Sequence, residues 1–151
     1  MKPEIPITIL MADDDEEDRL LAKEALEESH LVNELRFVKD GEELIDYLKN
    51  RKNHSDPVRF PLPGIILLDL NMPRKDGREA LKEIKDDPKL KYIPIVILTT
   101  SRAEEDIIKT YNLGANSFIS KPVTFEGLIQ VMKAIGKYWF EIVELPVKTS
   151  C

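Results

Sequence analysis

Cysteine, long apolar runs and glycine-rich loops are scarce in this sequence, and each scarcity excludes a class of protein. The single cysteine is the last residue, Cys151, so an internal disulfide or a cysteine-rich metal site is excluded. No apolar run reaches the roughly 18 residues that a membrane helix needs, and the segment 1–4 does not begin a signal peptide. The six glycines form neither a G-x-G-x-x-G motif nor a Walker loop, which excludes those nucleotide-binding modes. We therefore expect a soluble cytoplasmic protein with no membrane partner.

An excess of basic charge is also missing. The chain has 28 acidic and 22 basic side chains and a net charge of −6, which disfavours binding to nucleic acid. Its 42% of hydrophobic and 33% of charged residues are typical of a globular protein. We expect a single domain over residues 1–151, with a core from about 7 to 137 and a carboxyl-terminal helix extension and tail from about 138 to 151.

Short apolar segments alternate five times with segments of helical periodicity. The apolar segments are 7–12, 35–38, 65–68, 93–98 and 117–119. Each is too short for a helix and rich in Ile, Val, Leu or Phe, as buried strands are. Five strand–helix units in succession predict an α/β fold, with a parallel sheet covered by helices on both faces.

Polar residues stand at the carboxyl ends of four of the predicted strands. They are Asp13, Asp14, Asp69, Thr99 and Lys121. The carboxyl ends of parallel strands share one edge of the sheet, which is where ligands of open α/β sheets bind. The acids that follow, Asp15 to Asp18, fit the start of a helix, with Asp15 as its N-cap.

Three carboxylates at one sheet edge favour a divalent cation. At a separation of about 4 Å and an effective dielectric constant of about 20, each pair repels by about 4 kcal/mol. An incomplete all-oxygen shell suits Mg²⁺. A carboxylate, a divalent cation, a lysine and a hydroxyl are together the groups that are needed to place a phosphoryl group on Asp69.

Several motifs resemble the receiver domain of two-component response regulators. They are Ile9-Leu10-Met11-Ala12-Asp13-Asp14-Asp15, Leu67-Leu68-Asp69-Leu70-Asn71-Met72-Pro73 with Asp76-Gly77, Ile97-Leu98-Thr99-Thr100, and Gly114-Ala115 followed by Lys121-Pro122. The resemblance covers residues from about 7 to about 137. It implies a flavodoxin-like (βα)5 fold, a doubly wound five-stranded parallel sheet with strand order 2-1-3-4-5.

The resemblance also implies roles for residues around the expected phosphorylation site. Asp69 would accept a phosphoryl group from a phosphohistidine of a sensor histidine kinase. Mg²⁺ would be held by Asp14 directly, by Asp13 through water, by Asp69, and by the backbone carbonyl of Asn71. Asn71 and Ser101 lie where the family tunes hydrolysis of the aspartyl phosphate.

Three further residues have implied roles in the response to phosphorylation. Lys121 would pair first with Asp69 and then with the phosphoryl oxygens, and Thr99 would donate a hydrogen bond to one of them. Phe118 occupies the aromatic switch position. The Lys121–Pro122 bond is expected to be cis, as the family uses this bond to aim its lysine.

The last predicted helix is apolar on more than one face. The apolar side chains that do not cover the sheet indicate either core at a helix crossing or an interface, for which Val131, Tyr138, Trp139 and Phe140 are the candidate residues. The tail and the basic loop 51–64 resemble single-domain regulators that partner phytochrome-type histidine kinases. In those regulators the last helix and its extension contribute to a homodimer, which we expect here.

These features lead us to expect a stand-alone phosphoacceptor protein with a conformational or dimerisation output. It would be no enzyme beyond autocatalytic phosphoryl transfer and autodephosphorylation. One alternative is a Mg²⁺-dependent phosphatase with an aspartyl-phosphate intermediate. Such enzymes generally need an acid two residues after the nucleophile, where this chain has Asn71. Another alternative is a pseudo-receiver that only binds partners, against which the full set of site residues argues.

Overall fold

The computed structural model describes residues 8–29, 34–100 and 104–137. Its elements, in chain order, are β1 (Ile9–Ala12), α1 (Glu16–Glu28), β2 (Leu35–Val38), α2 (Gly41–Leu48), the short 3-10 helix η1 (Lys52–His54), β3 (Ile65–Leu68), α3 (Gly77–Asp86), β4 (Ile95–Thr99), α4 (Glu104–Asn112), β5 (Ser117–Ser120) and α5 (Phe125–Ile135). The strands form one five-stranded sheet in the order β2-β1-β3-β4-β5, and every neighbouring pair is parallel. The predicted fold class and strand order are confirmed.

The centre of the sheet consists of β1 and β3. All their side chains are buried, as expected of parallel strands that are covered on both faces. In the β1–β3 register Ala12 lies opposite Leu68, and the N–H of Asp69 donates to the carbonyl of Ala12 at 3.0 Å. Because the two strands end level with each other, Asp13 and Asp69 leave the sheet at the same point of its edge.

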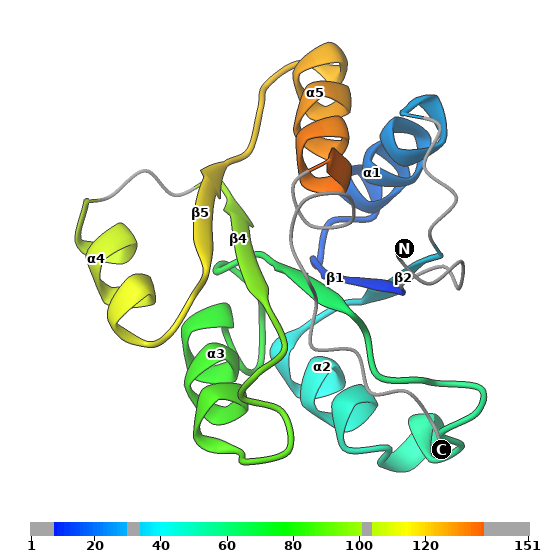
Figure 1. Cartoon of the computed structure of the whole chain (residues 1–151), viewed down its shortest axis with the longest axis vertical. Helices are drawn as coiled ribbons and strands as arrows, with labels where there is room; N and C mark the ends of the chain where they lie inside the picture. Colours follow the sequence, from blue (N-terminus) through cyan, green and yellow to red (C-terminus); the bar gives the residue numbers. More distant parts are fainter. Residues whose placement is uncertain (1–7, 30–33, 101–103, 138–151) are drawn as a thin grey trace.

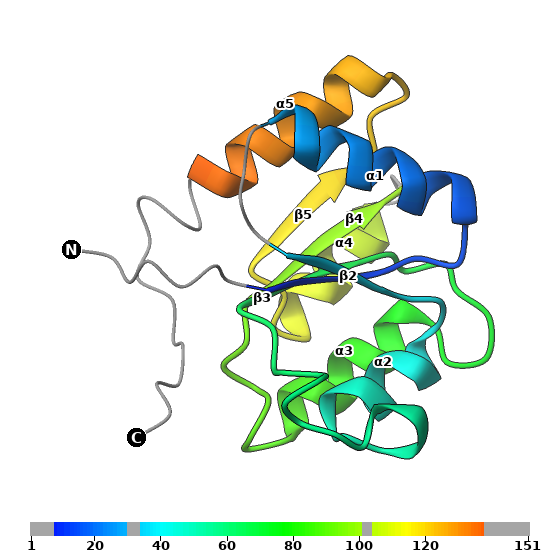
Figure 2. The same cartoon turned by 90° about the vertical axis from the view of Figure 1, so that its right-hand side faces the viewer.

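Helices cover both faces of the sheet. Figure 2 shows α1 and α5 on one side and α2 and α3 on the other, and Figure 1 shows α4 beside β5. Alternate strand residues supply the two cores: Met11 packs with Ala25 and Met132, whereas Leu10 packs with Leu81 on the opposite face. This alternation directs the strand side chains into two separate cores and leaves the polar groups at the strand ends.

Most helices begin at the carboxyl edge of the sheet with a capping side chain. Asp15, Asp40, Asp76 and Thr124 each accept a hydrogen bond from a backbone N–H in the first turn of α1, α2, α3 and α5. The prediction of Asp15 as an N-cap is confirmed. No helix in the described part of the chain combines the length and apolarity needed to cross a membrane.

The boundaries of β4 differ from the prediction. The sequence predicted a strand over 93–98, but the structure places it at Ile95–Thr99. Pro94 has no N–H to donate to a neighbouring strand, and its carbonyl instead accepts from Ile66 at 3.0 Å. The strand also extends one residue further than predicted, to Thr99, whose backbone is held by its pairing with Ser120 of β5.

The connection 51–64 is held by aromatic packing. The ring of Phe60 lies against those of Tyr47 and His54, with centroids 5.7 and 4.8 Å apart. The hydroxyl of Tyr47 donates to the carbonyl of Pro61 at 3.0 Å. Val58, which is 88% exposed, lies in the same connection, so part of this loop is at the surface.

Candidate functional site

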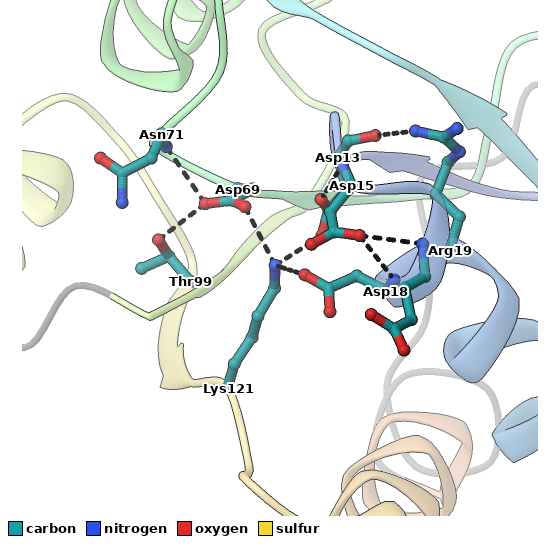
Figure 3. Close-up of polar contacts among 9 residues, drawn as sticks. Asp13, Asp15, Asp18, Arg19, Asp69, Asn71, Thr99 and Lys121 are labelled. Carbon is teal, nitrogen blue, oxygen red and sulfur yellow. Dashed lines mark hydrogen bonds and ion pairs between the residues drawn. The ribbon is translucent and has the colours of Figure 1, made fainter.

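The ammonium group of Lys121 lies at the centre of the carboxyl edge of the sheet. Its Nζ donates to Asp13 Oδ2 at 2.5 Å, to Asp18 Oδ2 at 2.7 Å and to Asp69 Oδ2 at 3.0 Å (Figure 3). The lysine side chain is only 10% exposed. Burial on its own lowers the pKa of Lys121, but the hydrogen bonds that Lys121 donates to Asp13 and Asp18, together with the charge of Asp13, outweigh burial and raise this pKa above its ordinary value. The lysine is therefore a permanent cation at this edge.

Asp69 is held on both carboxylate oxygens. Oδ1 accepts from the hydroxyl of Thr99 at 2.7 Å and from the backbone N–H of Asn71 at 3.1 Å, while Oδ2 accepts from Lys121. Figure 3 shows Thr99, Asn71 and Lys121 approaching this carboxylate from different sides. The side chains of Asp69 and Thr99 are both buried, so a carboxylate that ends an apolar strand is compensated by three donors.

Asp13 is fully buried beside Asp69. Its Oδ1 accepts from the N–H of Asp15 at 2.9 Å, and its backbone carbonyl accepts from Arg19 Nη1 at 2.8 Å. Burial raises the pKa of Asp13, and the hydrogen bond from Lys121 opposes this rise. Asp13 thus depends on a nearby positive charge to stay ionised.

The donor set fits a hard divalent cation. Asp13, Asp14 and Asp69 each offer a carboxylate oxygen, and these three atoms lie within 4.8 Å of one another. Asp14 is exposed whereas the other two are buried, so the cluster opens to solvent on one side. Oxygen ligands with room for water are what Mg²⁺ prefers. The carbonyl of Asn71, expected to be a further ligand, stays a prediction.

Gly77 lies next to the site, and no role was predicted for it from the sequence. A Cβ atom there would lie 2.3 Å from the carbonyl oxygen of Asp69 and 2.7 Å from the Cα of Leu70. The N–H of Gly77 also donates to the carbonyl of Leu70 at 2.9 Å. The start of α3 therefore lies directly against the backbone of Asp69, and only glycine permits that approach.

Asp18 is a second residue that was missed. It was read as one of several acids at the start of α1, yet it is a partner of Lys121. No signal in a single sequence separates it from its neighbours Glu16 and Glu17, which the structure leaves exposed. Only the position of α1 relative to β5 makes the difference.

The expectation of a cis Lys121–Pro122 bond is wrong for this structure. The described residues include no cis peptide bond. The lysine is aimed by other means: its backbone N–H donates to the carbonyl of Thr99 at 2.8 Å, which extends the pairing of β4 with β5 beyond Ser120. Three carboxylates then hold the ammonium group.

The remaining predicted residues either lie away from the carboxylates of Asp13 and Asp69 or fall outside the residues that the structure describes. Phe118 is partly buried against the core on the α2–α3 face, and its N–H is 3.2 Å from the hydroxyl of Tyr111, which accepts from it. Val131 is partly buried against the core beneath α1 and α5. The described residues do not include Ser101, Tyr138, Trp139 and Phe140. A switch role for Phe118 and an interface role for Val131 stay predictions.

Comparisons with known proteins agree with this geometry. Residues 9–133 match the family model of the response regulator receiver domain. Response regulator Rcp1 of Synechocystis sp. (strain PCC 6803) is 40% identical over 141 residues, which are 93% of this chain and 94% of Rcp1.

Two solved structures are similar over almost the whole chain. The phosphorylated cyanobacterial phytochrome response regulator RcpA has a TM-score of 0.88 and 40% identity, covering 95% of this chain and 100% of RcpA. The Mn²⁺-bound form of Rcp1 has a TM-score of 0.85 and 39% identity, covering 94% and 100%. With a family model that spans most of its length and relatives of this similarity, the chain belongs to the response regulator receiver domain family.

Proposed function

We propose that this chain is a stand-alone response regulator that accepts a phosphoryl group on Asp69 from a phosphohistidine of a sensor histidine kinase. The observation that carries the proposal is the arrangement around one carboxylate. Asp69 lies between the hydroxyl of Thr99 and the ammonium of Lys121 and beside the acids of the candidate metal cluster. A buried carboxylate that is oriented on both oxygens is suited to nucleophilic attack on a phosphoryl group.

The transfer exchanges one bond for another. A carboxylate oxygen of Asp69 attacks phosphorus, an O–P bond forms, and the N–P bond to the donor histidine breaks with its electron pair returning to the imidazole. Lys121 is positioned to bind a phosphoryl oxygen, and Thr99 Oγ1, now 2.7 Å from Asp69 Oδ1, can donate to another. When bound, Mg²⁺ supplies positive charge that offsets repulsion between the carboxylates and the phosphoryl oxygens. We assign its binding to Asp13, Asp14, Asp69 and the Asn71 carbonyl.

The finer assignments are parts of the same proposal. Similarity to Rcp1 and to RcpA, a phytochrome response regulator, supports a phytochrome-type kinase as the donor. We further propose that Mg²⁺ is the physiological cation and that the protein meets such a donor in the cytoplasm. We also propose that it has no enzymatic activity beyond self-phosphorylation and self-dephosphorylation. Asn71 and Ser101 would tune the hydrolysis rate.

A homodimer through the carboxyl-terminal segment is likewise proposed. Replacing Trp139 and Phe140 by polar residues should shift a dimer to a monomer in light scattering. An unchanged mass would count against this interface.

The central test is an intact-mass measurement after incubation with acetyl phosphate and Mg²⁺. We expect one phosphoryl adduct on the wild-type protein and none on Asp69→Asn, since the amide is not a nucleophile for this reaction. Asp87→Asn, a change at a partly buried acid at the end of α3, is the matched control and should be modified like the wild type. An equal adduct on Asp69→Asn would remove Asp69 from its role.

A further inference from the structure

We propose that Asp18 is a positioning residue that holds the ammonium group of Lys121 in place for phosphoryl transfer. The inference rests on the proposed function of Asp69. It starts from the number of donors: a lysine ammonium has three N–H groups, and the structure pairs them with three carboxylates, Asp13, Asp18 and Asp69. Every N–H group of Lys121 therefore has an acceptor, and Asp18 supplies one of them.

The three acceptors differ in burial. The side chains of Asp13 and Asp69 are 0% and 7% exposed, whereas that of Asp18 is 34% exposed. Two carboxylates thus hold the lysine from the interior, and Asp18 holds it from the solvent side. Without Asp18 the third N–H would turn to water, and the flexible four-carbon stem of the lysine could swing outward.

Asp18 is itself held by the start of α1. Its backbone N–H donates to Asp15 Oδ1 at 3.4 Å, and its carboxylate lies in the first turn of the helix, where negative charge is favourable. The helix therefore fixes the backbone of Asp18, and its short side chain can orient the longer side chain of Lys121. Glu16 and Glu17, its neighbours in the same turn, are exposed.

Phosphorylation modifies only one of the three acceptors of Lys121, the carboxylate of Asp69. Once the Asp69 carboxylate carries a phosphoryl group, Lys121 must exchange its bond to Asp69 for a bond to a phosphoryl oxygen. The carboxylate of Asp18, in α1, is not consumed by the reaction, so the bond from Lys121 to Asp18 can persist throughout. Asp18 then limits where the ammonium moves while the new bond forms.

The kinetic test compares Asp18→Ala with Glu17→Ala, which removes an adjacent exposed acid from the same turn. With acetyl phosphate and Mg²⁺, we expect Asp18→Ala to lower the phosphorylation rate at saturating donor roughly tenfold, as loss of a charge-assisted hydrogen bond does. KM should change by less than about twofold, since the donor itself is not contacted. Glu17→Ala should leave both parameters unchanged, and Asp18→Asn, which keeps an acceptor oxygen, should recover part of the rate.

A double-mutant comparison tests whether Asp18 acts through Lys121. In a Lys121→Met background, the further change Asp18→Ala should have no effect on the rate. An equal loss in both backgrounds, or equal rates for Asp18→Ala and Glu17→Ala, would overturn the inference while leaving the role of Asp69 intact.

A spectroscopic measurement makes the inference independent of phosphorylation. The Lys121 ammonium signal in ¹⁵N NMR should exchange its hydrogens with water faster in Asp18→Ala than in the wild type or in Glu17→Ala. This comparison needs no phosphodonor, so it remains decisive if Asp69 is never phosphorylated or if Lys121→Met does not fold. Unchanged exchange in Asp18→Ala would refute the positioning role.

Discussion

The guanidinium of Arg78 in α3 donates two parallel hydrogen bonds to the carboxylate of Asp106 in α4, at 2.8 Å to Oδ1 and 2.7 Å to Oδ2. Both side chains are mostly buried, with 22% and 18% exposed. The hydrogen bond to Asp106 raises the pKa of Arg78 against the opposing effect of burial. This paired geometry is the strongest form of an arginine–carboxylate contact. The Arg78–Asp106 pair therefore connects α3, which follows the loop of Asp69, to α4, which follows β4.

We expect the Arg78–Asp106 pair to contribute to stability through its geometry as well as its charge. Arg78→Lys keeps the charge but loses the two-pronged contact, and should lower the free energy of unfolding by about 1 kcal/mol. Urea unfolding of Arg78→Ala, Asp106→Ala and the double variant measures the coupling directly. Additive losses in the double variant would show that the two residues do not stabilise each other.

Gly77→Ala should disturb both the fold and the site. Its Cβ would overlap the carbonyl oxygen of Asp69, only 2.3 Å away, so the backbone of the β3–α3 loop has to move. We expect a loss of about 2 kcal/mol in unfolding free energy, typical of strain at a tight backbone approach, and slower phosphorylation by acetyl phosphate. Glu79→Ala, an exposed position in the same helix, is the control. Wild-type rate and stability in Gly77→Ala would contradict the importance of this contact.

The central part of the site was predictable from sequence because it depends on strand ends. Asp13, Asp69, Thr99 and Lys121 each follow or end a short apolar segment, and parallel strands bring such ends to one edge. The structure indeed joins all four through hydrogen bonds. No knowledge of helix orientation was needed for this prediction.

What the sequence could not predict depends on how helices lie on the sheet. Asp18 is an acid like its neighbours until α1 is placed beside Lys121, and Arg78 reaches an acid 28 residues away in another helix. Pairs of this kind carry no local pattern. The start of β4 was shifted for a different reason: the apolar run includes Pro94, which lacks the N–H that a strand residue donates.

We expect protonation of Glu83 at acidic pH to cause a small loss of stability. Its carboxylate accepts from Lys75 and lies 3.5 Å from the Nζ of Lys49, and the hydrogen bond from Lys75 holds the pKa of Glu83 below its ordinary value despite partial burial. A lowered pKa in the folded state means that the contribution is present above the unfolded pKa, near 4.3 for a glutamate, and disappears as the pH falls through the folded pKa.

The expected size of this effect is small because the side chains of Lys75 and Glu83 are 30% and 32% exposed, so solvent screening keeps it below about 1 kcal/mol. Urea unfolding of wild type and Glu83→Gln should differ at pH 7 and converge as the pH is lowered through the titration. Glu79→Gln on the same helix should show no such convergence. A wild-type advantage that stays constant down to acidic pH would contradict the assignment of this titration to Glu83.

Asp14 offers the cleanest test of the candidate metal cluster, because it is exposed. Asp14→Asn should leave the Lys121 contacts and the fold in place but remove a charged oxygen ligand. We expect the affinity for Mg²⁺ or Mn²⁺ to fall by about tenfold or more, measured by calorimetry without any phosphodonor. Glu16→Gln, which removes the same charge from an exposed position at the start of α1, separates ligation from general electrostatics. Equal weakening by both variants would mean that Asp14 attracts the cation without binding it.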